Sequence, residues 1–203
     1  SNGGTGDGSA TETLSLTFGS SSDVTTDPVC TFTDAQSNPM ANSPSTASGD
    51  AANGWTCALL VDDSDATGAM TFSIAFDDEN GNAGVAVTST DDLTAITIDN
   101  VHPELDDLAI ATTGTGGPSA TDVISLTFTS SSDVTTDPVC TFTDGSGAME
   151  NSGSVTVSGS ASGWTCQITV DDTDDDGAVG YSIAFSDANG NDGTTVTSAD
   201  AGI

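Results

Sequence analysis

The chain has 203 residues, a length that accommodates two domains of about 100 residues each. It contains no Lys or Arg and 31 Asp and Glu residues, so its formal net charge is -31. This composition excludes nucleic-acid binding through phosphate contacts and direct attraction to an anionic membrane, because both need basic side chains. The carboxylates must instead be offset by water, dissolved salt or bound cations.

In chain order, the first half predicts a series of short β-strands, because apolar and polar residues alternate. The alternating apolar sets are Leu14, Leu16 and Phe18; Cys30 and Phe32; Trp55, Cys57, Leu59 and Val61; Met70, Phe72, Ile74 and Phe76; Val85 and Val87; and Ile96 and Ile98. A period of two puts each set on one face of its strand. Gly, Ser, Thr, Asp and Asn fill the gaps, and no window has a sustained helical period. Several strands at this spacing within about 100 residues favour an all-β, Greek-key sandwich.

The second half of the chain repeats the first. Residues 20–34 and 130–144 both read SSSDVTTDPVCTFTD, and the segments GWTC at 54–57 and SIAF at 73–76 return at 163–166 and 182–185. Cys140 follows Cys30 by 110 residues, whereas Cys166 follows Cys57 by 109. One residue is therefore missing between the cysteines of the second copy, as expected for a loop. We predict two tandem domains, 1–100 and 101–203.

The cysteines predict one disulfide in each repeat, Cys30–Cys57 and Cys140–Cys166, because each pair lies on the inward faces of strands. A zinc site is the alternative. It would need four ligands, but each repeat offers two thiols, and the only histidine, His102, lies in the linker. Two disulfides indicate an oxidising, extracellular compartment.

The two copies begin and end out of phase with the predicted fold. Residues 105–111 predict a first strand for the second repeat, with no counterpart before Leu14. Residues 95–99 predict a last strand for the first repeat, with no counterpart in the second. We expect either that a longer array continues the chain or that neighbouring subunits supply strands to the open edges.

Acidic turns predict calcium binding, because Asp, Asn and backbone oxygens are the hard ligands that Ca²⁺ prefers. Asp172, Asp174 and Asp176 follow the pattern D-x-D-x-D-G, although the loop is not an EF-hand because Ile183 occupies the place of its bidentate Glu. The further candidates are Asp63 and Asp65 in the matching turn of the first repeat, Asp78, Asn80, Asn82, Asp187, Asn189 and Asn191 in a second turn, and Asp99 and Asn100 in the linker. Ordinary turn chemistry, in which Asp, Asn and Gly form local hydrogen bonds, is the alternative.

The sequence does not predict an enzyme. No Ser-His-Asp set recurs, and the chain offers no Lys or Arg to stabilise an anionic transition state. Trp55 and Trp164 lie on the apolar faces of their strands, so we expect them in the core rather than on a sugar-binding platform.

Four motifs stand out along the chain: Ser125-Leu126-Thr127-Phe128, Trp164-Thr165, the segment 177–193 and Ile98-Asp99-Asn100-Val101-His102-Pro103. Together they resemble the bacterial immunoglobulin-like repeats of very large secreted and cell-surface proteins. The cysteines depart from the usual pattern of these repeats. The resemblance implies two tandem immunoglobulin-like sandwiches with a spacer, adhesin or matrix role.

We therefore expect a structural repeat unit of an extracellular fibre, matrix or adhesin stalk, stabilised by Ca²⁺. Its expected partners are neighbouring copies of the same repeat or subunit, with no nucleic acid and no direct insertion into a membrane. A cell-surface module that recognises a glycan or a protein through its loops is the alternative.

Overall fold

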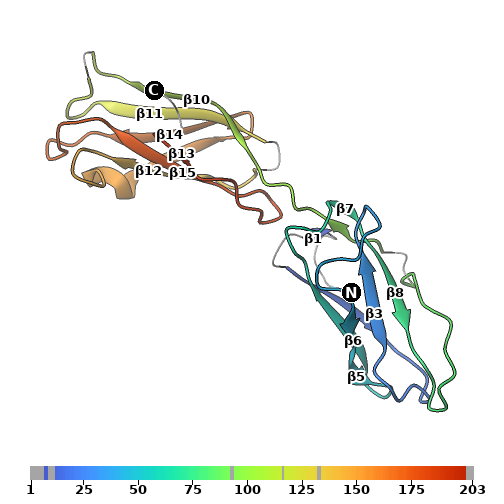
Figure 1. The fold of residues 1–203 in the computed structure, drawn as a ribbon. Helices are drawn as coiled ribbons and strands as arrows, with labels where there is room; N and C mark the ends of the chain where they lie inside the picture. The colour runs from blue at the N-terminus through green and yellow to red at the C-terminus, as the bar shows by residue number, and fades with distance from the viewer. Residues whose placement is uncertain (1–6, 9–11, 92–93, 116, 132–133, 200–203) are drawn as a thin grey trace. The chain divides into compact units, whose positions relative to one another are not determined.

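The structure is a computed structural model that describes residues 7–8, 12–91, 94–115, 117–131 and 134–199. The chain divides into two compact units, Ser1–Val101 (unit 1) and His102–Ile203 (unit 2), which are described separately (Figure 1). The strands of unit 1 are β1 (Asp7–Gly8), β2 (Thr13–Phe18), β3 (Val29–Thr33), β4 (Ser45–Thr46), β5 (Ser48–Asp50), β6 (Gly54–Leu60), β7 (Gly68–Ala69), β8 (Thr71–Ala75) and β9 (Thr97–Ile98). Those of unit 2 are β10 (Leu105–Thr112), β11 (Val123–Ser130), β12 (Val139–Thr143), β13 (Thr156–Ser160), β14 (Gly163–Thr169), β15 (Gly180–Ala184) and β16 (Val196–Thr197).

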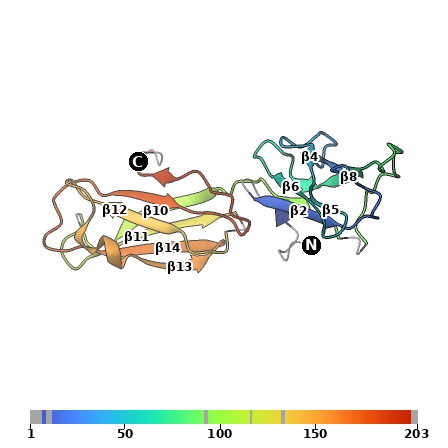
Figure 2. The same ribbon diagram turned by 90° about the horizontal axis from the view of Figure 1, so that it is seen from below.

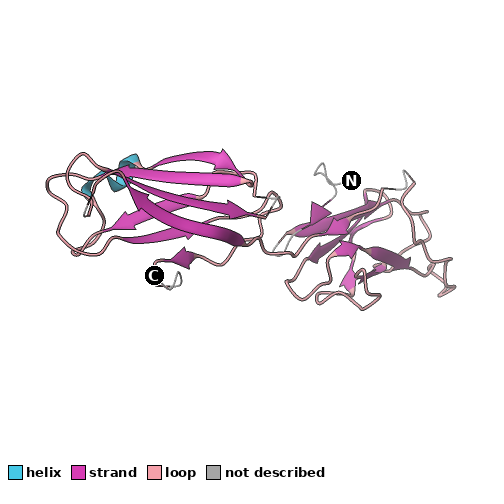
Figure 3. Cartoon of the chain, turned by 90° about the horizontal axis from the view of Figure 1, so that it is seen from above, coloured by secondary structure: helices cyan, strands magenta, loops and turns pink. Residues whose placement is uncertain are grey.

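Unit 2 is a sandwich of two sheets, with the strand orders β10-β11-β14-β13 and β12-β15-β16 (Figure 2). If the strands described in unit 2 are lettered A to G along the chain, these orders become A-B-E-D and C-F-G. This is the Greek-key order of a constant-type immunoglobulin domain. A short 3-10 helix, η1 (Glu150–Ser154), connects strands C and D (Figure 3).

Unit 1 has the same framework with shorter edges. Its two sheets have the orders β2-β6-β5 and β4-β3-β8, so that β2, β3, β5, β6 and β8 correspond to strands B to F. A single bridge between Ile74 and Val87 stands where β15 and β16 pair in unit 2. A third small sheet has the order β1-β9-β7. The predicted fold, two tandem immunoglobulin-like sandwiches, is therefore confirmed.

The strand register is the same in both units. In unit 1, β2 places Leu16 opposite Cys57 and Phe18 opposite Trp55. In unit 2, β11 places the equivalent residues opposite Cys166 and Trp164. Each apolar row thus faces the inside of its sandwich, as the period of two predicted.

The strand that precedes each tryptophan strand in its hairpin requires a glycine. Gly49 and Gly159 have φ values of 127° and 126°, a region that side chains rarely adopt. A Cβ atom at either position would also collide with the carbonyl oxygen of a second glycine, Gly54 or Gly163, across the hairpin. The close approach of the two strands therefore explains the Ser-Gly pair that occurs before both GWTC segments.

Each unit has its own apolar core. The tryptophans Trp55 and Trp164 are both 3% exposed, which confirms that they are core residues. The buried core of unit 1 also includes Leu14, Val24, Phe32, Met40, Leu59, Val61, Ile74 and Ile98. That of unit 2 includes Ile124, Leu126, Phe128, Val134, Phe142, Met149, Ile168, Tyr181, Ile183 and Phe185.

Two predicted strands of unit 1 differ from the structure. Val85 and Val87 were predicted to share one face of a strand, but Val85 is 89% exposed and Val87 forms only a bridge to Ile74, so the prediction of a strand here is wrong. Residues 97–98 within the predicted last strand do form β9, but β9 pairs with β1 and β7 in the third sheet. The predicted first strand of the second repeat, by contrast, is confirmed as β10.

Candidate functional site: disulfide clamps and acidic turns

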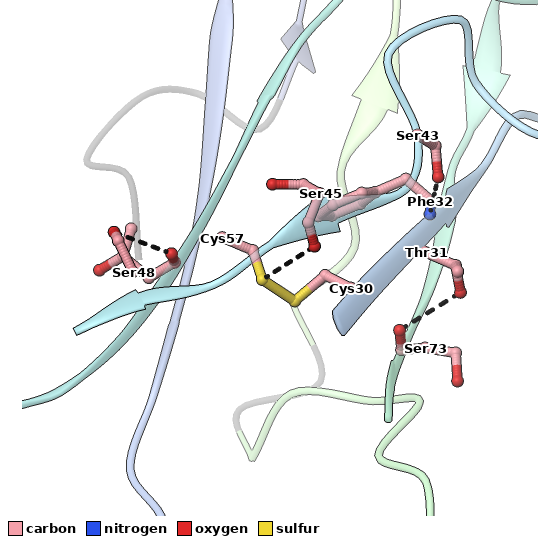
Figure 4. Close-up of a disulfide and its surroundings, with 9 residues drawn as sticks. Cys30, Thr31, Phe32, Ser43, Ser45, Ser48, Cys57 and Ser73 are labelled. Atoms are coloured by element: carbon pink, nitrogen blue, oxygen red, sulfur yellow. Dashed lines mark hydrogen bonds between the residues drawn. A yellow bond between two sulfur atoms is a disulfide. The ribbon is translucent and has the colours of Figure 1, made fainter. Parts of the chain in front are cut away.

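Each sandwich is clamped by one disulfide across its two sheets. Cys30–Cys57 joins β3 to β6, and Cys140–Cys166 joins β12 to β14, with a Cα–Cα distance of 6.3 Å in both. All four cysteines are buried, and the structure confirms both predicted pairings. Figure 4 shows the bond of unit 1, where the Ser45 carbonyl oxygen lies 3.9 Å from the Cys57 sulfur.

The tryptophan beside each disulfide has a polar partner that sequence reasoning missed. The indole N–H of Trp55 donates to Ser20 Oγ at 2.9 Å, and that of Trp164 donates to Ser130 Oγ at 3.0 Å. A buried indole N–H without a partner would destabilise the core, so each serine has a structural role. The signal was present in the sequence, because both serines begin the identical 15-residue segments.

In the first acidic turn, the middle aspartate points inward and accepts backbone hydrogen bonds. Asp65 is 4% exposed, and its two carboxylate oxygens accept the N–H groups of Ala41 and Asp62 at 2.8 and 2.9 Å. Asp174 accepts the equivalent N–H groups, those of Glu150 and Asp171, both at 2.8 Å. Both aspartates therefore tie the turn after the tryptophan strand to the loop that follows strand C.

The other predicted ligands of this turn lie outside. Asp63, Asp172 and Asp176 are exposed, whereas Asp65 is buried and Asp174 is half-buried. Among the residues that the structure describes, no three Asp, Glu, His or Cys side chains come together as they would around a metal ion. Calcium binding by these loops stays a prediction from the sequence.

A second aspartate, Asp144, which was not among the residues predicted from the sequence, also connects the turn after the tryptophan strand to the loop that follows strand C. Asp144 accepts the N–H of Asp175 at 2.9 Å across the two loops, together with the N–H groups of Ser146 and Gly147 in its own turn. These bonds, led by the one from Asp175, lower the pKa of Asp144 from 3.8 to about 2.

Asp34 is the counterpart of Asp144 in unit 1. It is buried, and its Oδ1 accepts the N–H groups of Gln36 and Asn38, both at 2.9 Å. Its Oδ2 accepts the N–H of Ala66 from the other loop at 3.3 Å. The pKa of Asp34 is lowered, above all by the hydrogen bond from Asn38. Both aspartates end the identical segments, which is the signal that could have identified them.

The second predicted turn has the hydrogen bonds of an Asx turn in both units. In unit 1, Asp78 Oδ1 accepts the N–H groups of Asn80 and Asn82 at 2.8 Å, and its Oδ2 accepts the Asn82 side-chain amide at 2.8 Å. The Asn82 amide is the main cause of the lowered pKa of Asp78. In unit 2, Asp187 makes the same three bonds with Asn189 and Asn191.

The linker asparagine connects the end of unit 1 to its first acidic turn. The Asn100 amide nitrogen donates to the carbonyl oxygens of Asp62 and Asp65 at 2.9 and 2.8 Å. Asp99 instead accepts the N–H of Val101 at 3.1 Å. Of the predicted ligands, the structure thus brings Asn100 and Asp65 together, through the Asp65 backbone rather than its carboxylate.

His102, the first residue of unit 2, is exposed, and its Nδ1 donates to the Asp192 carbonyl oxygen of the same unit at 2.7 Å. In the described part of the chain, no helix has the length and apolar character to cross a membrane.

These features define the chain as a tandem of disulfide-clamped, immunoglobulin-like repeat modules. No family model matches it, and no curated protein matches its sequence. Similar solved structures include a tetra-tandem repeat from the extending region of a large adhesion protein, 22% identical over 86% of this chain, with a TM-score of 0.31. The chain spans 42% of the length of that structure. A structure of tandem titin immunoglobulin domains is 15% identical over 95% of this chain and 89% of its own length, with a TM-score of 0.28. A second titin structure is 15% identical over 94% of this chain and 91% of its own length, also with a TM-score of 0.28.

Proposed function

We propose that the chain is a structural repeat unit of an extracellular fibre, matrix or adhesin stalk, in which it acts as a stiff, strongly hydrated spacer between neighbouring repeats. The observation that carries this proposal is the kind of residue that the duplication retains. The identical segments supply the disulfide, the core and the carboxylates that connect loops: Cys30, Phe32 and Asp34 in unit 1 and Cys140, Phe142 and Asp144 in unit 2. The residues that both copies retain therefore maintain the fold of the module.

The clamps suit a module that is exposed to tension and proteases. Each disulfide joins the two sheets of one sandwich, so the sheets cannot separate completely while the bond is intact. Disulfides persist in oxidising compartments, which supports an extracellular location. The absence of Lys and Arg also leaves no site at which trypsin-like proteases cleave.

The charge is part of the same proposal. A net charge of -31 keeps repeats apart and hydrated at high local concentration. It also concentrates cations near the surface, and Ca²⁺ bound at exposed carboxylates would reduce the repulsion within each module. The role of calcium in this proposal rests on charge and donor type.

Single-molecule force spectroscopy tests the mechanical part of the proposal. Each unit should unfold as a separate event, and its disulfide should lock the enclosed segment against extension. For Cys30–Cys57, with a sequence separation of 27, the locked length is about 9 nm. Reduction should lengthen each event by about that amount. Equal lengths with and without reductant would contradict a clamp under load.

Immunoelectron microscopy tests the location. Antibodies against the chain, applied to intact cells that produce it, should label filaments, matrix or surface appendages. Label that is confined to the cell interior would refute the proposal.

A further inference from the structure

Among the residues that the structure describes, one strand of unit 1 pairs on one side only, whereas its counterpart in unit 2 pairs on both sides. In unit 2, β11 pairs with β14 on one side and with β10 on the other. In unit 1, the equivalent strand β2 pairs with β6, and no other described residue pairs with it. The two strands have nearly the same sequence, TLSLTF and VISLTF, so the difference lies in the partner.

The open edge also leaves apolar surface uncovered. Leu126 and Phe128 of β11 are 0% and 2% exposed, whereas the equivalent Leu16 and Phe18 of β2 are only partly buried. In unit 2, the apolar side chains of β10, among them Ile110 directly opposite Leu126, pack against the core. A strand beside β2 would therefore bury side chains as well as pair backbone groups.

The edge of β2 lacks the features with which proteins protect exposed strands. Its six residues include no charge and no proline, in a chain with a net charge of -31. The corresponding edge of unit 2, which β10 forms, is protected by contrast. β10 carries Asp106 and Asp107, its register shifts between Asp106 and Ala109, and Asp107 has a φ of 53°. Such a bulge and such charges disfavour the addition of another strand.

We propose that the outer edge of β2 is a strand-acceptor site, and that its occupant is a strand of the Leu105–Thr112 type from another repeat of this kind. Unit 2 shows such a strand in place and gives the register. With the offset of 110 residues between β2 and β11, donor positions equivalent to Ile110 and Thr112 lie opposite Leu16 and Leu14. The recognition is β-strand addition, in which backbone bonds supply affinity and alternate side chains supply specificity.

This inference rests on the proposed function, because it makes neighbouring repeats the source of the donor. Its test uses only the chain and a peptide, so the acceptor site and the proposed function can be refuted independently of each other. A chain that binds the donor but is absent from fibres would refute only the proposed function. A chain found in fibres that does not bind the donor would refute only the acceptor site.

The probe is a synthetic peptide with the sequence of residues 103–114, titrated into the full chain by calorimetry. The control peptide carries L108D and I110D, which keep the length but place charges on the inward face. The donor peptide should bind at least about tenfold more tightly than the control, because the control must bury two carboxylates. Hydrogen exchange followed by mass spectrometry should show new protection in residues 13–18 and none in 123–130. Equal binding of both peptides, or protection only in 123–130, would overturn the proposal.

A self-complemented chain gives a second test that does not depend on a destabilising substitution. The sequence of residues 103–112 is placed directly before Gly3, which reproduces the spacing between β10 and β11. This chain should protect residues 13–18, raise the melting temperature of unit 1 by on the order of 5 °C, and no longer bind the free peptide. The same addition with L108D and I110D should leave peptide binding unchanged. Undiminished binding to the self-complemented chain would place the site elsewhere.

Analytical ultracentrifugation of the chain without peptide tests whether β2 of a second copy, rather than a donor strand, occupies the edge of β2. A concentration-dependent dimer in which residues 13–18 are already protected would mean that β2 pairs with β2 of a second copy. That result would overturn the donor assignment, whereas a monomer with unprotected residues 13–18 supports it.

Discussion

Removal of the Cys30–Cys57 disulfide should destabilise unit 1 strongly, because the bond closes a long loop in the unfolded chain. The two cysteines are 27 residues apart, and the chain-entropy model gives about 3.5 kcal/mol for a loop of that length. Both side chains are 0% exposed, so replacement by alanine also removes buried packing. The double variant C30A/C57A should therefore lower the free energy of unfolding of unit 1 by at least about 3.5 kcal/mol, or roughly 300-fold in the folding equilibrium.

Tryptophan fluorescence can follow unit 1 alone if Trp164→Phe is present in both chains that are compared, since Trp55 is then the only tryptophan. Denaturant titration should show a lower midpoint for the double variant. The oxidised and reduced forms of the chain without the alanines separate the loop-closure contribution from the loss of packing, since reduction keeps both sulfur atoms. A loss below about 1 kcal/mol would mean that the clamp does not constrain the unfolded chain as the entropy model requires.

Three further predictions concern the acidic turns. Asp65→Ala should lower the free energy of unfolding of unit 1 by about 1–3 kcal/mol in denaturant titration, because two backbone N–H groups lose their acceptor. The control Asp63→Ala, at an exposed position, should change this free energy by less than about 0.5 kcal/mol. Equal effects of the two substitutions would contradict the structural role of Asp65. The pKa of Asp144 is lowered to about 2 from 3.8, so its ionised form stabilises unit 2 fully above pH 3.8, and this stabilisation is lost as the pH falls through about 2. Asp144→Asn, compared with the exposed Asp172→Asn, should remove that part of the acid sensitivity in pH-dependent unfolding, and an unchanged acid profile would refute the role of Asp144. Millimolar CaCl₂ should raise the melting temperature more than NaCl of equal ionic strength, and equal effects would show that the carboxylates bind no calcium.

The sequence was sufficient to predict the fold because its signals were local and occurred twice. The alternation around Cys57 and Trp55 set the faces of the strands, and the repeated cysteine spacing identified both disulfides. The prediction failed where pairing depends on distant partners. Val85 and Val87 alternate as in a strand, yet this segment pairs with β8 only through the bridge between Val87 and Ile74, and Val85 is 89% exposed.

The acidic turns were located correctly, but their internal arrangement could not be predicted from the pattern. The D-x-D spacing is the same whether carboxylates converge on a cation or the middle one turns inward to accept backbone N–H groups. Asp65 turns inward because it accepts the N–H of Ala41, and Asp174 because it accepts the N–H of Glu150. Each of these donors lies 24 residues away in the sequence. Asp34 and Asp144 were overlooked because a single aspartate at the end of a strand has no distinctive spacing.

The absence of Lys and Arg explains why these aspartates have the partners that they do. In most proteins a buried or half-buried carboxylate pairs with a basic side chain, but here the available donors are backbone N–H groups and neutral side chains. Asp34 and Asp65 both use N–H groups that belong to loops, where no sheet or helix would otherwise bind them. The inward-facing aspartates therefore give the loop N–H groups an acceptor, and the same hydrogen bonds stabilise the carboxylate charges. Because these bonds lie within a few ångströms and are partly shielded, they should persist in high salt, while the repulsion among exposed carboxylates is screened. The six residues of β2 carry no charge, so they add nothing to that repulsion at the edge where a further strand would pair.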